Sequence, residues 1–380
     1  MTSEPFDPER PDPTTTALNT TSLERIGWSS FFQDQIPALP SVIPGRVASA
    51  NHGRFLVWTA ARDTGYAEVD ASVSGLLRKS GALWPAVGDW VLLRTNEPVI
   101  DRVLIRKTCV SRKQPEREIR EQILAANIDV LFIVSGLDRD YNPRRIERYL
   151  VMANESGARP VVLLNKSDLA TELALDLDDI VTRTQLLSPA ITVIPISALS
   201  DHGLEALPAQ LAPGQTAALI GSSGVGKSTI LNRLLGQDLQ ATMPVRSSDS
   251  RGRHTTTSRQ LFLMPGGWLL MDLPGLREVQ LWASPNQQTE QLDSNLEATF
   301  DDIHQLAQTC RFRDCTHTAE PGCAVLAATL DPARLANFKK MQRELTQLDR
   351  KTHPAQGRTA KSRPKSIDKS TRNHQERDSS

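Results

Sequence analysis

A glycine-rich loop between an aliphatic run and an amphipathic segment constrains the fold of this chain more than any other feature. The loop covers residues 221–229 and reads Gly-Ser-Ser-Gly-Val-Gly-Lys-Ser-Thr. The run Thr216 to Ile220 precedes it, and four aliphatic residues between positions 230 and 235 follow at helical spacing. Glycines let successive backbone N–H groups point at one anion, and a helix N-terminus adds its positive dipole end. The pattern therefore predicts a strand, a phosphate-binding loop and a helix.

Each residue of this loop is a candidate nucleotide contact. Lys227 is expected to reach the β- and γ-phosphates, where it also serves catalysis, and the Ser228 hydroxyl is expected to bind Mg²⁺. A chance glycine turn is the alternative, but the flanking strand and helix supply the context that the motif requires. The predicted contacts are Gly221, Ser222, Ser223, Gly224, Val225, Gly226, Lys227, Ser228 and Thr229.

A second motif indicates that the nucleotide is a guanine nucleotide. The buried strand predicted over Arg159 to Leu164 ends at Asn165-Lys166-Ser167-Asp168. The Asp168 carboxylate can accept hydrogen bonds from the ring N–H and exocyclic amine of guanine, and adenine would leave that carboxylate unpaired. Asn165 can hold the loop and contact the base, with the Lys166 stem over the ring. Taken alone, this tetrapeptide also occurs in ordinary loops.

Three further segments end strands or form polar loops that suit the same nucleotide. The strand over 190–196 ends at Ser197-Ala198, where a backbone N–H can meet the base oxygen. In the polar loop 251–257, one threonine can bind Mg²⁺ when the γ-phosphate is present. The strand over 268–271 ends at Asp272, which suits Mg²⁺, and the Gly275 N–H can touch the γ-phosphate.

The order of these segments is reversed relative to ordinary GTPases. There the phosphate loop comes first and the base-reading loops come last, whereas here Asn165–Asp168 precedes the phosphate loop by about 55 residues. Loops at the carboxyl ends of parallel strands meet along one sheet edge. We therefore expect a GTPase sheet with circularly permuted connectivity, in a mostly parallel α/β domain with flanking helices.

Before this domain, five short segments with period-two patterning occupy about 70 residues. They predict a small barrel such as an OB-fold, an architecture that often binds oligonucleotides. The alternative is a purely structural barrel with ordinary surface cations. The basic residues of the segment, which predict a positive surface with Trp58 and Trp84 nearby, are Arg46, Arg54, Arg62, Arg78, Lys79, Arg106, Lys107, Arg112 and Lys113.

Three of the four cysteines lie within fourteen residues and share that stretch with a histidine. The spacing C-x₄-C-x-H-x₅-C lets one loop surround a single ion, and three thiolates with one imidazole form a closed tetrahedral set without a position for water. We expect one structural Zn²⁺ that contributes folding free energy to a helical module. Unliganded cysteines beside a surface histidine are the alternative. The predicted ligands are Cys310, Cys315, His317 and Cys323.

Net charge is near zero, but charge is unevenly distributed. Residues 1–24 carry five acids and one arginine, whereas residues 351–380 carry eight Lys or Arg and three acids. This basic, aromatic-free segment predicts disorder, either as a solubilising tail or as a polyanion-binding arm. The chain has no run of eighteen apolar residues, and its N-terminus is unlike a signal peptide, so we expect a cytoplasmic protein that binds no membrane.

Together these motifs resemble the bacterial RsgA (YjeQ) ribosome small-subunit-dependent GTPases over about residues 40–350. Composition predicts a disordered tail at 1–38 and a basic disordered tail at 351–380. Between them, the resemblance implies an OB-fold barrel at 39–113, a permuted GTPase domain at 118–285 and a zinc-binding helical domain at 286–350. It also implies a monomer that binds GTP and GDP, docks on 16S rRNA of the 30S subunit late in maturation, and hydrolyses GTP when the subunit stimulates it.

The resemblance further implies that Thr256, the middle of three threonines, is the switch residue that binds Mg²⁺. Leu276 follows Asp272-Leu-Pro-Gly275, at the place where Ras-like enzymes carry the glutamine that orients water. We therefore expect His254 to position the water, since an imidazole accepts a hydrogen bond near neutral pH. The alternative for His254 is a histidine that only contacts RNA. The alternatives for the whole protein are a large-subunit GTPase and an RNA-binding protein with a regulatory nucleotide switch.

Overall fold

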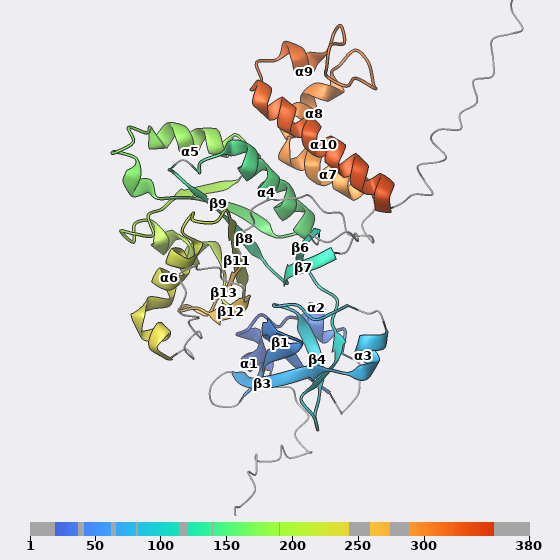
Figure 1. Ribbon diagram of the computed structural model, residues 1–380, viewed down its shortest axis with the longest axis vertical. Helices are drawn as coiled ribbons and strands as arrows, with labels where there is room; N and C mark the ends of the chain where they lie inside the picture. The colour runs from blue at the N-terminus through green and yellow to red at the C-terminus, as the bar shows by residue number, and fades with distance from the viewer. Residues whose placement is uncertain are drawn as a thin grey trace, which may run out of the picture.

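The computed structural model describes residues 20–36, 42–61, 66–80, 83–113, 121–138, 140–189, 191–242, 259–273 and 289–352. Three parts follow one another along the chain (Figure 1): a small β-barrel drawn in blue, a central α/β domain drawn in green and yellow, and a helical module drawn in orange and red. The central domain lies between the other two, so both flanking parts contact it.

Five antiparallel and parallel strands close into the predicted barrel. They are β1 (Val42–Asn51), β2 (Arg54–Ala60), β3 (Tyr66–Val73), β4 (Trp90–Arg94) and β5 (Val99–Val103). Their order is β1-β2-β3-β5-β4, and β1 also pairs with β4, which closes the sheet on itself. Alternate side chains such as Val47, Val57 and Val91 fill the interior, as the period-two pattern requires. The short helix α3 (Gly75–Lys79) follows β3, and the Ser74 hydroxyl accepts a hydrogen bond from the Leu77 N–H at its start. The prediction of a five-stranded barrel is confirmed.

The prediction of an unstructured segment over residues 1–38 is wrong for residues 20–36. Helices α1 (Thr20–Glu24) and α2 (Ser30–Gln33) form there. Leu23, Ile26 and Phe32 are at most 2% exposed, and Trp28 stacks edge-on against Trp90 at 4.6 Å between ring centroids. Apolar side chains concentrated in these few residues thus pack with Trp90 and Leu92 of β4, in a cluster separate from the barrel interior.

Two residues of the predicted positive surface are buried instead. Trp58 is 4% exposed, and its indole N–H donates to Glu68. Arg46 is 1% exposed and lies where the barrel meets the central domain. Neither side chain is available to an oligonucleotide, whereas Trp84 is 49% exposed.

The central domain is built on a six-strand part of the main sheet. Its strands are β8 (Val130–Gly136), β9 (Arg159–Asn165), β10 (Thr192–Pro195), β11 (Thr216–Gly221), β12 (Gln260–Leu263) and β13 (Leu269–Asp272), in the order β10-β9-β8-β11-β13-β12. All neighbours are parallel except β12 and β13, which form an antiparallel hairpin. Fully buried aliphatic strands of this kind are typical of sheets covered on both faces.

Helices cover this sheet, and a small hairpin precedes it. The helices are α4 (Pro143–Ser156), α5 (Leu177–Gln185) and α6 (Lys227–Thr242), which is kinked at Gly236; the 3₁₀ turns are η1 (Ser167–Leu169), η2 (Leu204–Ala206) and η3 (Pro208–Gln210). Strands β6 (Cys109–Lys113) and β7 (Glu121–Ala126) form a separate two-stranded sheet. The apolar run from Ala125 to Ser135 is divided between β7 and β8 because Asn127 adopts a positive φ of 56°.

The barrel and the central sheet are joined by backbone pairing as well as by side chains. Ser49 of β1 is the register partner of Gln260 of β12, so the barrel strands and the central strands form one continuous eleven-stranded sheet. Gln260 is also the register partner of Asp272 on β13. A single ladder position therefore links the barrel to the last residue of β13.

The C-terminal module consists of α7 (Thr289–Thr299), α8 (Asp301–Gln308), α9 (Ala324–Ala327) and α10 (Pro332–Thr352). Its core joins Leu296, Phe300 and Met341 with Val151 of α4, which places the module against the central domain. Helices α7 and α8 are separated at Phe300. Among the described helices, none combines the length and the apolar composition that a membrane crossing requires.

Candidate nucleotide site and metal centre

The phosphate loop leaves the centre of the sheet, where β11 lies between β8 and β13. At Gly221, φ is 155°, and a Cβ there would lie 2.4 Å from the Val134 carbonyl oxygen. At Gly226, φ is 100°, and a Cβ would lie 2.3 Å from Asn165 Nδ2. These two positions need glycine because neighbouring strands and loops approach the backbone too closely for any side chain.

Lys227 begins α6 and turns its ammonium group back over the loop. Nζ donates to the carbonyl oxygens of Gly221, at 2.9 Å, and Ser222, at 2.8 Å. Burial lowers the pKa of Lys227, while the nearby carboxylates of Asp272 and Asp140 oppose that shift. A buried cation held against the glycine-rich loop is suited to phosphate.

Asn165 brings the two predicted base-reading loops and the phosphate loop together. Its Nδ2 donates to the Val225 carbonyl oxygen at 2.7 Å, and its Oδ1 accepts from the Ala198 N–H at 3.0 Å. The side chain is 2% exposed. One amide therefore holds segments from β9, β10 and β11 at a common edge of the sheet.

The carboxylate predicted to read guanine lies in the same cluster. The Ser197 hydroxyl donates to Asp168 Oδ1 at 2.5 Å and accepts from the Ser200 N–H. Lys166 adopts a positive φ of 67°, and its Nζ pairs with Asp138 at 2.5 Å. Ser167 opens the 3₁₀ turn that presents Asp168. The Asp168 side chain is thus held by Ser197, and the Lys166 side chain is held by Asp138.

Asp272 lies at the carboxyl end of β13, in register with Leu219 of β11. It is 3% exposed and acts electrostatically on Lys227. A buried carboxylate beside the phosphate loop is well placed for a divalent cation next to bound phosphates. His254, Thr256 and Gly275 lie outside the described residues, so the structure places neither the predicted water-positioning group nor the predicted switch residue.

The sequence did not reveal that α4 also contacts the phosphate loop. Arg145 Nη1 donates to the Ser222 hydroxyl oxygen at 2.7 Å and forms an ion pair with Asp140. Tyr149, one turn later, also hydrogen-bonds Ser222, and burial raises the pKa of Tyr149 to about 12. The i,i+4 spacing of Arg145 and Tyr149 shows that they share a face, but no sequence pattern indicates that this face meets residue 222.

The four predicted zinc ligands form one compact cluster, with all ligand atoms within 4.8 Å of one another. Cys310 Sγ lies 3.9 Å from Cys323 Sγ, and His317 Nδ1 lies 3.7 Å and 3.5 Å from those sulfurs. Tetrahedral Zn²⁺ with Zn–S near 2.3 Å requires ligand separations of about 3.5–3.8 Å. The donor set therefore fits one zinc ion.

A network of charged side chains holds the C-terminal module to α4. Glu147 of α4 is fully buried and accepts from Arg334 at 2.8 Å and from Asn337 at 2.6 Å. Arg334 also pairs with Asp302 at 2.7 Å, and Arg148 pairs with Glu344 at 2.6 Å. The module is thus fixed to the same helix that contacts the phosphate loop.

Comparison with known proteins identifies the family. A model described as RsgA GTPase matches residues 103–282. The protein of Opitutus terrae named small ribosomal subunit biogenesis GTPase RsgA is 42% identical over 367 residues, which cover 91% of this chain and 96% of that relative. This chain belongs to the RsgA GTPase family. As a member of that family, it is a GTP-hydrolysing enzyme. A model described as 50S ribosome-binding GTPase also matches residues 216–356.

Solved structures show the same RsgA-family architecture. YjeQ from Thermotoga maritima superposes with a TM-score of 0.56 at 25% identity, covering 80% of this chain and 99% of that one. YloQ, described as a circularly permuted GTPase, has the same fold with a TM-score of 0.53, at 23% identity and with coverage of 82% and 96%. The permuted order predicted from the motifs is therefore confirmed.

Proposed function

We propose that this RsgA-family GTPase acts in maturation of the small ribosomal subunit: it binds GTP with Mg²⁺, docks on 16S rRNA of the 30S subunit, and hydrolyses GTP to GDP and phosphate faster when docked. The observation that carries the nucleotide part is the junction at Asn165, where two base-reading loops meet the phosphate loop through hydrogen bonds of 2.7 and 3.0 Å. The names of its relatives, small ribosomal subunit biogenesis GTPases, support the subunit as partner.

In this proposal the described residues divide the nucleotide between them. Asp168 accepts hydrogen bonds from the guanine edge, and Ala198 offers its N–H to the base oxygen. Lys227 and the loop 221–229 hold the phosphates. Ser228 and Asp272 are the protein ligands for Mg²⁺, which supplies charge neutralisation between the β- and γ-phosphates when bound.

Three assignments concern positions that the described residues do not include. Thr256 completes the Mg²⁺ ligands, the Gly275 N–H contacts the γ-phosphate, and His254 holds the attacking water. Phosphoryl transfer depends on positioning more than on covalent chemistry, so turnover by the free protein is expected to be slow until the subunit fixes these groups.

The C-terminal module supports an RNA-docking role through its metal loop. The residues between Cys310 and Cys315 include Arg311, Phe312 and Arg313, and the Arg311 guanidinium lies 5.5 Å from the Phe312 ring centroid. Phe312 is 41% exposed. An exposed aromatic ring between two cations, on a loop fixed by one structural Zn²⁺, is a surface that RNA phosphates and bases can bind.

The test is GTP turnover by the purified protein with 30S, 50S and 70S particles, together with co-sedimentation in a non-hydrolysable GTP analogue. We expect stimulation and co-sedimentation with 30S.

Asp168→Asn should remove the preference for GTP over ATP, while Asp201→Asn, an exposed acid paired with Arg233, should keep it. His254→Ala should lower subunit-stimulated turnover, and unchanged stimulated turnover would remove His254 from the mechanism.

A second candidate is a GTPase that serves the large subunit, and the match of residues 216–356 to a 50S ribosome-binding model favours it. Stimulation by 50S alone would establish this alternative. RNA binding without stimulated hydrolysis by any particle would instead indicate an RNA-binding protein that uses GTP as a regulatory ligand.

We further propose that the protein acts as a cytoplasmic monomer, which gel filtration coupled to light scattering of the native protein would test.

A further inference from the structure

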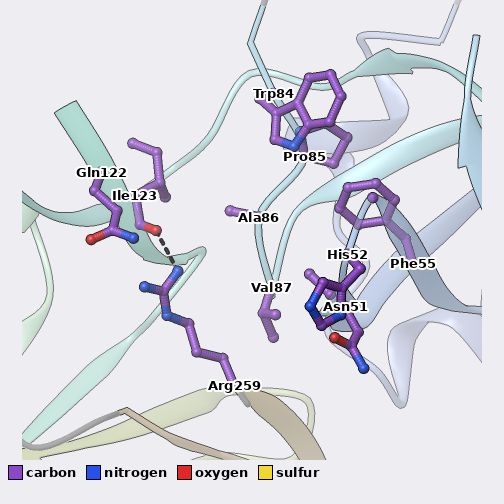
Figure 2. A pocket seen from close by; sticks show the side chains of 12 residues that line it. Asn51, His52, Phe55, Trp84, Pro85, Ala86, Val87, Gln122, Ile123 and Arg259 are labelled. Carbon is purple, nitrogen blue, oxygen red and sulfur yellow. Dashed lines mark hydrogen bonds between the residues drawn. The ribbon is translucent and has the colours of Figure 1, made fainter. Parts of the chain in front are cut away.

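A cavity of about 540 Å³ lies where the barrel meets the central domain. Figure 2 shows side chains from three segments facing it: the β1–β2 turn with Asn51, His52 and Phe55, the segment with Trp84, and the pair Gln122 and Arg259 from the central domain. The volume falls within the range of small-ligand pockets, which is about 300–1,000 Å³. Both domains are needed to form it.

The barrel supplies an aromatic wall that is held in place. The Trp84 ring contacts Phe55 edge-on at 6.3 Å between centroids, and the Trp84 side chain remains half exposed. Arg106 donates to the Trp84 carbonyl oxygen at 3.0 Å and pairs with Asp89, which in turn accepts from the Ala86 N–H at 2.8 Å. The indole is therefore presented to the cavity by a rigid backbone.

The opposite wall carries a guanidinium and amide groups. Arg259 Nη1 donates to the Ile123 carbonyl oxygen at 2.8 Å, which anchors the arginine across the cavity from the indole. Gln122 and Asn51 add amide donors and acceptors at the rim. An aromatic face combined with cationic and amide donors matches a flat heterocycle that has hydrogen-bond acceptors on its edge.

We propose that this cavity binds one unpaired nucleobase of RNA, stacked on Trp84 and hydrogen-bonded from the side of Arg259 and Gln122. The assignment rests on the proposed function in one respect, namely that RNA is the partner. It adds one defined site to the positive surface expected from the sequence, from which Arg46 and Trp58 are excluded by burial.

The position of the cavity gives this site a consequence for catalysis. Ala50 and Asn51 follow Ser49 on β1, and Arg259 precedes Gln260 on β12. Ser49, Gln260 and Asp272 occupy one ladder position across three strands. A base bound here would contact segments adjoining the strand that is paired with Asp272, the carboxylate proposed to bind Mg²⁺, and we expect occupancy to raise GTP turnover.

The binding test uses the full-length, zinc-loaded protein and fluorescently labelled ten-nucleotide oligouridylate and oligoadenylate. Fluorescence anisotropy of the labelled RNA measures the binding affinity. Trp84→Ala is expected to weaken binding about tenfold, as loss of one base–aromatic stack does, and Trp84→Phe should retain most of the affinity. Leu83→Ala is the matched control, because Leu83 is equally exposed at 48% and is not part of the cavity wall. A ten-residue abasic ribose-phosphate chain should bind wild type and Trp84→Ala equally.

The catalytic test measures GTP turnover with and without 30S subunits. Trp84→Ala and Arg259→Gln should keep basal turnover and lose most of the stimulated increment. Wild-type RNA affinity in both variants, or equal affinity of wild type for oligouridylate and the abasic chain, would overturn the nucleobase site. Failure of 30S to stimulate the wild-type protein would overturn the proposed function instead, and the oligonucleotide arm would still decide the cavity.

Discussion

Two buried arginines attach the central domain to its neighbours, and they do so with opposite kinds of partner. Arg46 lies between the barrel and the central domain, and Arg334 lies between the C-terminal module and α4. Their side chains are almost fully inaccessible. The comparison shows two ways in which a protein can compensate for removing a guanidinium from water.

Arg46 is surrounded by neutral acceptors. It donates to the carbonyl oxygens of Ile26, Gly88 and Asn127 and to the hydroxyl of Thr216, the first residue of β11. Burial lowers the pKa of Arg46 to about 10, and the more distant acids only partly oppose that shift. Dipoles from four segments therefore stabilise one cation without a contacting carboxylate.

Arg334 instead contacts two carboxylates, Glu147 and Asp302, and its guanidinium also lies 4.7 Å from the Phe300 ring centroid. Burial lowers the pKa of Arg334, but the hydrogen bonds and charges of Asp302 and Glu147 together outweigh burial, so the pKa is raised overall. The junction at the C-terminal module thus depends on charges that pH can change, whereas the barrel junction depends on backbone geometry.

The largest expected effect comes from removing a zinc ligand, which should unfold the C-terminal module and leave the barrel junction intact. Cys323→Ser removes a buried zinc ligand, and zinc binding contributes about 10–16 kcal/mol to the folding of small zinc domains. We expect the C-terminal module to lose its cooperative unfolding transition in scanning calorimetry, while the transition of the barrel and central domain persists. Chelation of wild type should reproduce the result. Retention of both transitions would show that the module folds without metal.

Arg46→Ala should cost about 4 kcal/mol, because it leaves buried carbonyl groups and a hydroxyl without their donor. Lysine is not expected to restore the loss, since an ammonium group cannot reach acceptors on four segments in the fork geometry. Urea unfolding measures the change. The control is Arg54→Ala, an exposed cation paired with Asp70, whose loss should change stability little.

Arg334→Ala should cost about 3 kcal/mol, somewhat less than the barrel substitution, because Arg144 and Asn337 still contact Glu147. Adding Glu147→Gln should recover part of the loss, since the second change removes the buried negative charge that has lost its arginine partner. Unfolding of the single and double variants measures the coupling. A double variant no more stable than Arg334→Ala would contradict an ionic role for this junction.

A second glutamate of α4, Glu155, should make the free energy of unfolding depend on pH. Burial raises the pKa of Glu155 from 4.5 to about 8, and within the described part of the chain its Oε1 has no hydrogen-bond partner. The folded state therefore holds a proton that the unfolded chain releases between these values, so this stabilisation is complete below pH 4.5 and is lost as pH rises to 8. We expect a decrease of up to about 3 kcal/mol between pH 5 and 8.

Glu155→Gln provides the control for this pH dependence. The amide cannot ionise, so the free energy of unfolding should lose that decline and be higher than wild type at pH 8. Equal pH dependence of the variant and wild type would assign the titration to another group. Urea unfolding at several pH values measures both proteins.

The smallest expected effect concerns the face of α4 opposite the module. Arg145→Ala removes the hydrogen bond to Ser222, and a loss of about 1 kcal/mol in phosphate-loop positioning should lower kcat/KM for GTP about five- to tenfold. Arg183→Ala, an exposed pair on α5, should leave turnover unchanged. If Arg145→Ala turns over GTP like wild type, and the Arg145→Ala, Ser222→Ala double variant turns over GTP like Ser222→Ala, the contact does not position the loop.

Much of the central domain could be predicted from the sequence because its signals are local. A glycine-rich loop, an Asn-Lys-x-Asp tetrapeptide and a Cys₃His spacing each encode their geometry within a few residues. The aromatic cluster between Leu23 and Phe32 was a further local signal, and the helices that it forms were missed only because proline and threonine dominate the preceding residues.

The chain by itself determined which loops exist and which ions and nucleotide they suit, since ligand chemistry and backbone freedom are properties of residue types at short spacing. Tertiary structure alone decided that Arg46 is an internal anchor, that Arg145 meets Ser222, and that Trp84 faces Arg259 across a cavity. These contacts join residues tens to hundreds of positions apart. Whether an arginine is solvated or buried depends on where distant backbone segments converge, and no local pattern contains that information.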